Sequence, residues 1–193
     1  MTFLKTFTVS AALALACIAP LASAGKQAPL PSDSVYKLAL PLTDAQGRTQ
    51  DWSKLQGKPR VVAMFYTSCQ YMCPLIVESG KAVERALPPA ERAKVGIALI
   101  SLDPKHDTPA QLTAMAKQRN VDPAQWTLAV PKPDDVRKVA GVLGVRYRLL
   151  ADGNFNHTSA LVLLDARGRI VARTEQVGAT PDPAFVKAVR AQL

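Results

Sequence analysis

Two cysteines with three residues between them are the most chemically informative feature of the sequence. Cys69 and Cys73 follow the apolar run 61–66 and stand directly before Pro74, which suits the first turn of a helix. Side chains four residues apart face the same side of a helix, so the two sulfurs can converge on one metal ion or on each other. The backbone N–H groups and the dipole of a helix N-terminus favour the thiolate, which binds metals and attacks disulfides. The pair therefore predicts either a metal site or a redox-active dithiol.

Two simpler interpretations of this pair fit the sequence less well. A structural disulfide between Cys69 and Cys73 would close a very short loop and would remove little entropy from the unfolded chain. Burial of both cysteines in the core is at odds with their position at the turn between a strand and a helix. We therefore interpret the pair as chemically active.

The choice between metal and redox chemistry depends on a third ligand. His157 lies in a polar loop that leads into the apolar run 160–164, and such a loop can reach the end of the sheet that carries the cysteines. Two thiolates and one imidazole suit copper, because soft thiolates hold Cu(I) and an imidazole also accommodates Cu(II). Zinc accepts the same donors, although a structural zinc site normally has four of them. From the residues alone His157 is a candidate ligand, and a polar surface histidine is the alternative.

Other polar or sulfur-containing side chains nearby have plainer interpretations. His106 precedes an expected helix and is interpreted as a solvated residue. Met72 could offer a thioether to Cu(I), but core filling is the preferred interpretation. Asp103 and Asp107 could form a carboxylate pair, although Asp107 is expected to cap the helix that begins near Pro109. None of these residues is added to the predicted site.

Strand-like and helix-like patterns alternate along the rest of the chain. Apolar runs rich in β-branched residues predict strands over 61–66, 96–102 and 160–164, and a short turn joins the last of these to 169–173 as a β-hairpin. Helical periodicity with start and stop signals predicts helices over 76–87, 109–116, 136–143 and from 183 onward. The alternation indicates an α/β fold, and the late hairpin makes its sheet mixed rather than purely parallel.

The N-terminus has the pattern of a secretory signal. Residues 1–24 contain one basic side chain, Lys5, then an apolar stretch over about 7–21, and they end in Ala-Ser-Ala. The stretch is shorter than a membrane span and contains Pro20, so we expect cleavage after residue 24 and loss of Cys17 with it. Lipid attachment at Cys17 is the alternative, although Ala14 stands where a lipoprotein signal prefers a larger aliphatic residue. A flexible lead-in over 25–34 and one domain over 35–193 are expected to follow.

The chain is basic but contains no nucleic-acid-binding motif. Its 193 residues include 24 Lys and Arg against 15 Asp and Glu, and this composition fits one globular domain. Arginines are concentrated in the C-terminal third, where they could favour an acidic docking partner or an anionic membrane surface, with a solvated basic face as the plainer interpretation. They are Arg146, Arg148, Arg167, Arg169 and Arg173. No nucleic acid is expected as a partner of an exported protein, and we expect a monomer.

Four segments, in this order and at these spacings, resemble the Sco/SenC family of copper-binding proteins. They are 69–74 (CQYMCP), 101–104 with 107–109 (SLDP and DTP), 144–147 (GVRY), and 157–158 with 164–168 (HT and LDARG). The resemblance covers about residues 42–171. It implies a thioredoxin-like mixed sheet flanked by helices, with an N-terminal β extension and the late β-hairpin.

The resemblance also implies a chemistry and a place of action. Copper, as Cu(I) or Cu(II), would be held by Cys69, Cys73 and His157. The protein would be an exported assembly factor rather than an enzyme, acting in the periplasm or another extracytoplasmic space, at or near a membrane. It would deliver copper to the binuclear copper centre of a haem-copper terminal oxidase, or keep the thiols of that oxidase subunit or of another copper protein reduced.

The sequence departs from the family pattern at two places beside the expected ligands. Many members have His just before the first cysteine and Asp just before the copper histidine, where this sequence has Ser68 and Asn156. Loss of that carboxylate removes one way to orient the imidazole. The alternative function is a thiol-disulfide oxidoreductase that uses Cys69 and Cys73 as its catalytic redox pair without a metal.

Overall fold

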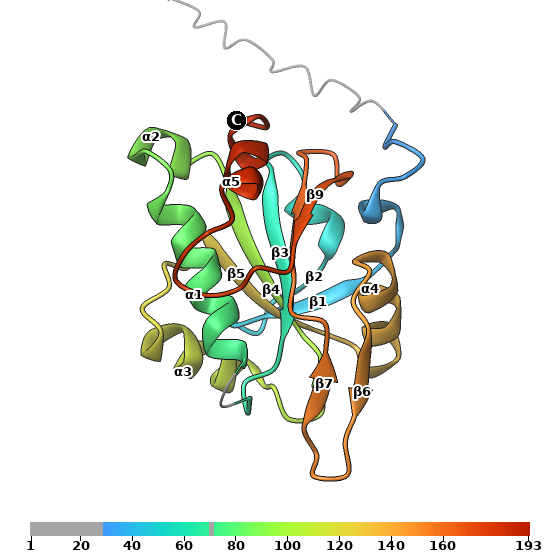
Figure 1. Ribbon diagram of the computed structural model, residues 1–193. Helices are drawn as coiled ribbons and strands as arrows, with labels where there is room; N and C mark the ends of the chain where they lie inside the picture. Colours follow the sequence, from blue (N-terminus) through green and yellow to red (C-terminus); the bar gives the residue numbers. More distant parts are fainter. Residues whose placement is uncertain (1–28, 70–71) are drawn as a thin grey trace, which may run out of the picture.

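The computed structural model describes residues 29–69 and 72–193 (Figure 1). The expected signal over 1–24, Cys17 and the first residues of the lead-in lie outside the described residues. Short 3₁₀ helices, η1 (Val35–Lys37), η2 (Trp52–Leu55) and η3 (Pro133–Asp135), accompany the longer elements. In the described ranges no helix is both long enough and apolar enough to cross a membrane.

A seven-stranded mixed sheet forms the centre of the molecule. Its order is β2 (Thr49–Asp51), β1 (Pro41–Asp44), β5 (Trp126–Pro131), β4 (Gly96–Ser101), β3 (Arg60–Phe65), β8 (Leu161–Leu164) and β9 (Ile170–Thr174). The three central strands, β5, β4 and β3, are parallel, whereas β1 and β8 add to them antiparallel. The carboxyl ends of β3 and β4 therefore lie at one edge of the sheet, where loops can carry functional groups.

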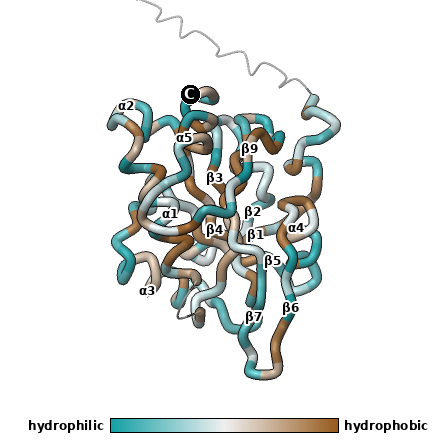
Figure 2. Tube along the Cα trace, viewed as in Figure 1, coloured by the Kyte–Doolittle hydropathy of each residue, from teal (hydrophilic) through white to brown (hydrophobic). Residues whose placement is uncertain are grey.

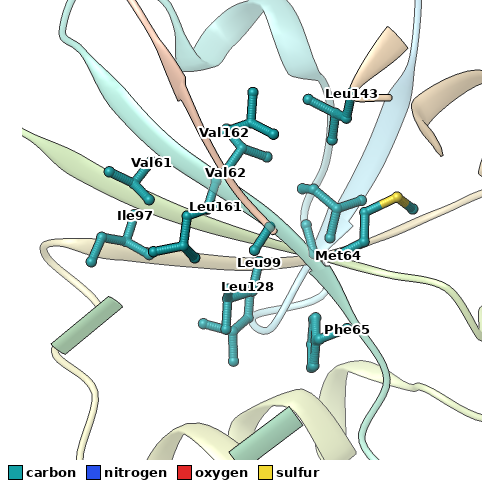
Figure 3. Close-up of a cluster of buried hydrophobic side chains, with 14 of the residues drawn as sticks. Val61, Val62, Met64, Phe65, Ile97, Leu99, Leu128, Leu143, Leu161 and Val162 are labelled. Carbon is teal, nitrogen blue, oxygen red and sulfur yellow. The ribbon is translucent and has the colours of Figure 1, made fainter. Parts of the chain in front are cut away.

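Helices cover this sheet on both faces, as expected for parallel strands buried on two sides. The helices are α1 (Met72–Arg85), α2 (Pro89–Arg92), α3 (Pro109–Gln118), α4 (Val136–Val142) and α5 (Pro183–Arg190). Side chains of β3 alternate between the two layers: Met64 lies on the side of Leu143, and Phe65 lies on the opposite side with Leu99 (Figure 3). The central strands are thus held by apolar packing on both faces.

A separate two-stranded sheet projects from one end of the molecule. It pairs β6 (Tyr147–Leu149) with β7 (Phe155–His157), antiparallel, and it lies at the end opposite α2 and α5 (Figure 1). The prediction that His157 lies in a loop is wrong. His157 ends a strand because its backbone pairs with Tyr147 across the hairpin.

Most of the expected elements are present. The structure confirms the strands at β3, β4 and β8, the β8–β9 hairpin, the helices α1, α3, α4 and α5, and the N-terminal β extension as β1 and β2. The sequence patterns do not predict β5, β6 or β7.

At the N-terminal side, Ser34 Oγ donates to the Arg167 carbonyl (2.6 Å) and Asp33 pairs with Arg169 (3.1 Å), so these residues contact the β8–β9 turn.

Candidate metal centre

The two cysteines lie where β3 passes into α1. β3 ends at Phe65 and α1 begins at Met72, with Pro74 in its first turn as expected. The Tyr66 N–H donates to Cys73 Sγ (3.3 Å), and the Cys73 N–H donates to Cys69 Sγ (3.3 Å). Cys73 is buried, Cys69 is partly exposed, and no disulfide joins them. The main chain therefore presents both thiols at one point of the loop.

The pKa of Cys73 is raised, although this residue lies in the first turn of a helix. The neighbouring Cys69 thiol and burial together raise that pKa well above its ordinary range, against the weaker effect of the Tyr66 N–H. The direction of this shift is opposite to the stabilised thiolate that the sequence predicts. A second sulfur and a low-polarity environment disfavour the charged form more than one backbone donor favours it.

Tyr66 connects the cysteine loop to the β6–β7 sheet. The Phe155 N–H donates to Tyr66 Oη (3.2 Å), and the Tyr66 hydroxyl faces the Phe155 carbonyl at 3.4 Å. The Tyr66 ring also makes edge-on contacts with the rings of Phe155 and His157, with centroid separations of 5.2 and 6.0 Å. Burial raises the pKa of Tyr66 to about 12, so it acts as a neutral hydroxyl at physiological pH. Tyr66 thus holds the cysteine and histidine segments in one relative position.

The imidazole of His157 is oriented so that one nitrogen faces inward without a partner. Nδ1 lies 3.2 Å from the Thr158 carbonyl, and because a carbonyl only accepts, this contact places the proton on Nδ1. Nε2 then carries the lone pair, is buried, and has no hydrogen-bond partner among the described residues. Burial lowers the pKa of His157, which keeps the ring neutral. A neutral imidazole with an unpartnered lone pair is the form that binds metal.

His157 and Cys69 line the same cavity, which has a volume of about 590 Å³. Met72 and Tyr66 contribute to the wall on the cysteine side, and Leu150 to the wall on the hairpin side. Within the described residues, no three His, Cys, Asp or Glu side chains are already close enough to hold a metal ion. The structure therefore brings the three predicted ligands to one region, but not into a preformed three-ligand cluster.

Asp107 performs a different role from the one expected of it. The N-cap of α3 is Thr108, which forms a capping box with Gln111. The buried Asp107 carboxylate instead accepts hydrogen bonds from the Thr67 N–H (3.1 Å), the Thr67 hydroxyl and the Ser101 hydroxyl (2.5 Å). It thereby ties the loop after β4 to the residue two positions before Cys69. Sequence analysis missed Asp107 and Tyr66 as supports of the site, and the only local signal was their position just after two strands.

The remaining candidates are also placed by the structure. His106 is exposed, and its Nδ1 contacts Asp103 Oδ2 at 2.8 Å, in agreement with its interpretation as a residue outside the site. Met72 is not a core residue: its side chain is 38% exposed and lines the cavity shared by Cys69 and His157. Its thioether is therefore available at the rim of the site.

The donor atoms present fit a soft metal ion. Two sulfurs in contact and an unpartnered, buried imidazole nitrogen form a set that suits copper in particular. An unpaired buried polar atom costs free energy, and coordination of an ion would relieve this cost. The donor atoms of these residues are therefore compatible with copper on chemical grounds alone.

Comparison with known proteins identifies relatives that share this arrangement of elements. The model of the SCO1/SenC family matches residues 32–192. A protein of Stutzerimonas stutzeri that is named for copper binding is 30% identical over 107 residues, which are 52% of this chain and 52% of that protein. The chain therefore spans about half the length of that relative.

Two solved structures have the same fold. ScoI of Bradyrhizobium japonicum, solved with copper bound, is 26% identical with a TM-score of 0.67, over 81% of this chain and 98% of that one. A SCO1/SenC family lipoprotein of Bacillus anthracis is 21% identical with a TM-score of 0.71, over 80% of this chain and 93% of that one. The expected thioredoxin-like fold is confirmed by these similarities.

Proposed function

This chain belongs to the SCO1/SenC family, and we propose that it is an exported assembly factor that holds copper through Cys69, Cys73 and His157. Copper is the metal of this site, in agreement with the copper-bound Bradyrhizobium structure and the copper-binding name of the Stutzerimonas relative. The family has a role of the cytochrome oxidase assembly type. We propose that this protein delivers copper to the binuclear centre of a terminal oxidase, or keeps the thiols of that centre reduced.

The observation that carries this proposal is the unpartnered Nε2 atom of His157. This nitrogen is buried, Nδ1 of the same ring contacts the Thr158 carbonyl, and the residue His157 lines the cavity that also contains Cys69. A histidine without a ligand to bind would be expected to turn a buried nitrogen toward water or a hydrogen-bond donor. A copper ion held by Cys69 and Cys73 would satisfy this nitrogen if the hairpin brought His157 to the ion.

Binding and release of copper follow from the state of the two thiols. Cys69 and Cys73 lose their protons when they coordinate the ion, and His157 supplies the third donor. Oxidation of the two thiolates by a disulfide of a partner protein would form the Cys69–Cys73 bond and break the partner's S–S bond; two electrons pass to the partner's sulfurs, which take their protons from solvent. This step removes two of the three ligands, so the redox state of the pair would control copper release.

The place of action is proposed from the N-terminal sequence and one relative. Residues 1–24 have the pattern of a secretory signal, and the Bacillus anthracis relative is named a lipoprotein. We propose a periplasmic or other extracytoplasmic location, at or near a membrane. The copper-receiving partner would be an oxidase subunit or another copper or thiol protein, and the acting form a monomer.

Copper titration of the reduced protein tests the ligand set. We expect one tightly bound equivalent of Cu(I) under competition with a chelator, and a loss of affinity of about tenfold or more in His157→Ala because one of three donors is removed. His106→Ala is the matched control, since it removes the only other histidine and should leave affinity unchanged. Equal affinity of the parent and His157→Ala would overturn the proposal.

A second function is favoured by the unequal exposure of the two thiols. Cys69 is partly exposed in the cavity, whereas Cys73 is buried behind it, which suits an attacking and a resolving cysteine of a thiol-disulfide oxidoreductase. On this alternative, His157→Ala keeps full exchange activity with a dithiol partner. Failure of Cys73→Ser to accumulate a mixed disulfide through Cys69 would count against it.

A further inference from the structure

The five arginines of the C-terminal third form two groups in the folded protein, those with a side-chain partner and those without one. Arg167 donates to the Pro29 carbonyl and Arg169 pairs with Asp33, so both contact the N-terminal segment. Arg173 donates to the Leu143 carbonyl (2.8 Å) and pairs with Glu175 (3.2 Å). Arg146 and Arg148 are exposed, and their guanidinium groups form no ion pair or hydrogen bond with any described residue.

These two arginines line a groove beside the proposed copper site. The groove has a volume of about 420 Å³, and its wall includes Asn156, Thr158 and Glu175. His157 lines both this groove and the cavity that contains Cys69. The imidazole therefore separates the groove from the cysteines, so a molecule in the groove would lie next to a proposed copper ligand.

Arg148 lies in β6 and Arg146 stands directly before this strand. Residues two apart on a strand point to the same side, so Arg146 and Arg148 lie about 7 Å apart on one face. Tyr147 faces the other way and packs on Phe155 at a centroid separation of 6.3 Å. The basic face is thus distinct from the aromatic face that contacts the cysteine loop.

We propose that this groove is the docking site for an extended acidic segment of the protein that exchanges copper or electrons with the site. The proposal rests on the proposed function and names the chemistry of its partner. Alternate carboxylates of an extended segment repeat at the spacing of Arg146 and Arg148, and each can accept the paired N–H groups of one guanidinium. Desolvation of two unpaired charges is compensated best by such a partner.

The shape and surroundings of the groove favour a protein segment over a membrane surface. The groove is concave, Glu175 in its wall is already paired with Arg173, and Asn156 and Thr158 can bond a peptide backbone. The β6–β7 sheet also carries apolar residues (Figure 2), and Leu149, on the same side of β6 as Tyr147, is 60% exposed. Exposed apolar residues near a basic groove are a typical composition for a protein interface.

Binding of a synthetic peptide tests the groove directly. The probe is a fluorescent peptide of alternating Glu and Thr, compared with one of alternating Gln and Thr by fluorescence anisotropy. We expect the Glu peptide to bind, salt to weaken it, and Arg146→Glu/Arg148→Glu to weaken it by about tenfold or more. Lys94→Glu/Lys187→Glu makes the same change in net charge at exposed residues near α2 and α5, at the far end of the molecule, and should have little effect.

The outcomes separate this inference from the proposed function. Absence of binding to the parent, or equal loss in both double variants, would overturn the docking site. Binding of phosphatidylserine vesicles that depends on Arg146 and Arg148, without peptide binding, would assign the groove to a membrane and overturn it as well. The copper affinity of both double variants should equal that of the parent. A parent protein that fails to bind copper would therefore contradict the copper site and not the docking groove.

Discussion

At the scale of single residues, His157 shows how an imidazole can be oriented without a neighbouring carboxylate. Asn156 stands where many family members have Asp, and the Thr158 carbonyl accepts the Nδ1 proton instead. A carbonyl fixes the same tautomer as a carboxylate would. Because it is uncharged, it polarises the Nδ1–H bond less and leaves the ring less electron-rich. The departure from the family pattern therefore preserves the direction of the Nε2 lone pair while making it a weaker donor.

The Asp107 carboxylate holds the start of the cysteine loop in place through its hydrogen bonds with Thr67. Replacement by Ala leaves the Thr67 N–H and the Thr67 and Ser101 hydroxyls without their acceptor in a buried position. We expect Asp107→Ala to lower the free energy of unfolding by about 3 kcal/mol and to weaken copper binding, because Cys69 is two residues from Thr67. Urea denaturation and copper titration measure the two effects, and unchanged values of both would contradict this role.

Asp107→Asn distinguishes the hydrogen bonds of this residue from its charge. The amide oxygen can still accept from Thr67, so the loss of stability should be much smaller than in Asp107→Ala. Burial raises the pKa of Asp107, so its favourable contribution is complete below its unfolded pKa and is lost as pH rises through its folded pKa. The Asn variant should therefore compare better with the parent at pH 7 than at pH 3.

At the scale of elements, α1 is seated on the sheet through one close contact with β5. A Cβ built on Gly80 would lie 2.4 Å from the Trp126 ring, and that ring is fixed by a hydrogen bond from its Nε1 to Glu84 (2.9 Å). Both Gly80 and Glu84 belong to α1, one helical turn apart. The position of α1, and with it that of Cys73, therefore depends on the absence of a side chain at residue 80.

Gly80→Ala should move α1 away from the sheet. We expect a loss of about 1–3 kcal/mol in the free energy of unfolding, because the gain in helix propensity is smaller than the cost of overpacking against Trp126. Gly141→Ala is the control, since a Cβ there meets no atom within 4 Å and should stabilise α4 by up to about 1 kcal/mol. If both substitutions stabilise the protein, the contact with Trp126 does not limit the position of α1.

The elements that sequence analysis recovers are those with local signals. The β3–α1 junction is predictable because an apolar run, two cysteines and Pro74 follow one another within the chain. β6 and β7 are three residues each, too short to establish an alternating pattern, and β7 is held through Tyr66, which lies 89 residues from Phe155. Asp107 was misassigned for the same reason, because its partner Thr67 is 40 residues away.

At the scale of the whole molecule, the residues of the proposed copper site lie at the carboxyl ends of the parallel strands. The cysteine loop follows β3, the Asp107 loop follows β4, and the β6–β7 sheet reaches this edge from the other half of the chain (Figure 1). Functional groups commonly lie at this edge of an open α/β sheet because successive loops meet there. Here the two sulfurs come from one loop and the imidazole from a small sheet that projects from the core.

Copper should therefore stabilise the entire fold by joining these separate segments. An ion that binds the folded chain at about 100 times its Kd adds about 2.7 kcal/mol to the free energy of unfolding, which raises the Tm by roughly 5–10 °C for a chain of this size. Thermal unfolding of the reduced protein, followed by circular dichroism with and without Cu(I), measures the shift. The shift should persist in His106→Ala, fall in His157→Ala, and disappear when a stronger chelator removes the ion. An equal shift in both histidine variants would mean that β7 is not joined to the cysteine loop, and that copper binds through the sulfurs alone.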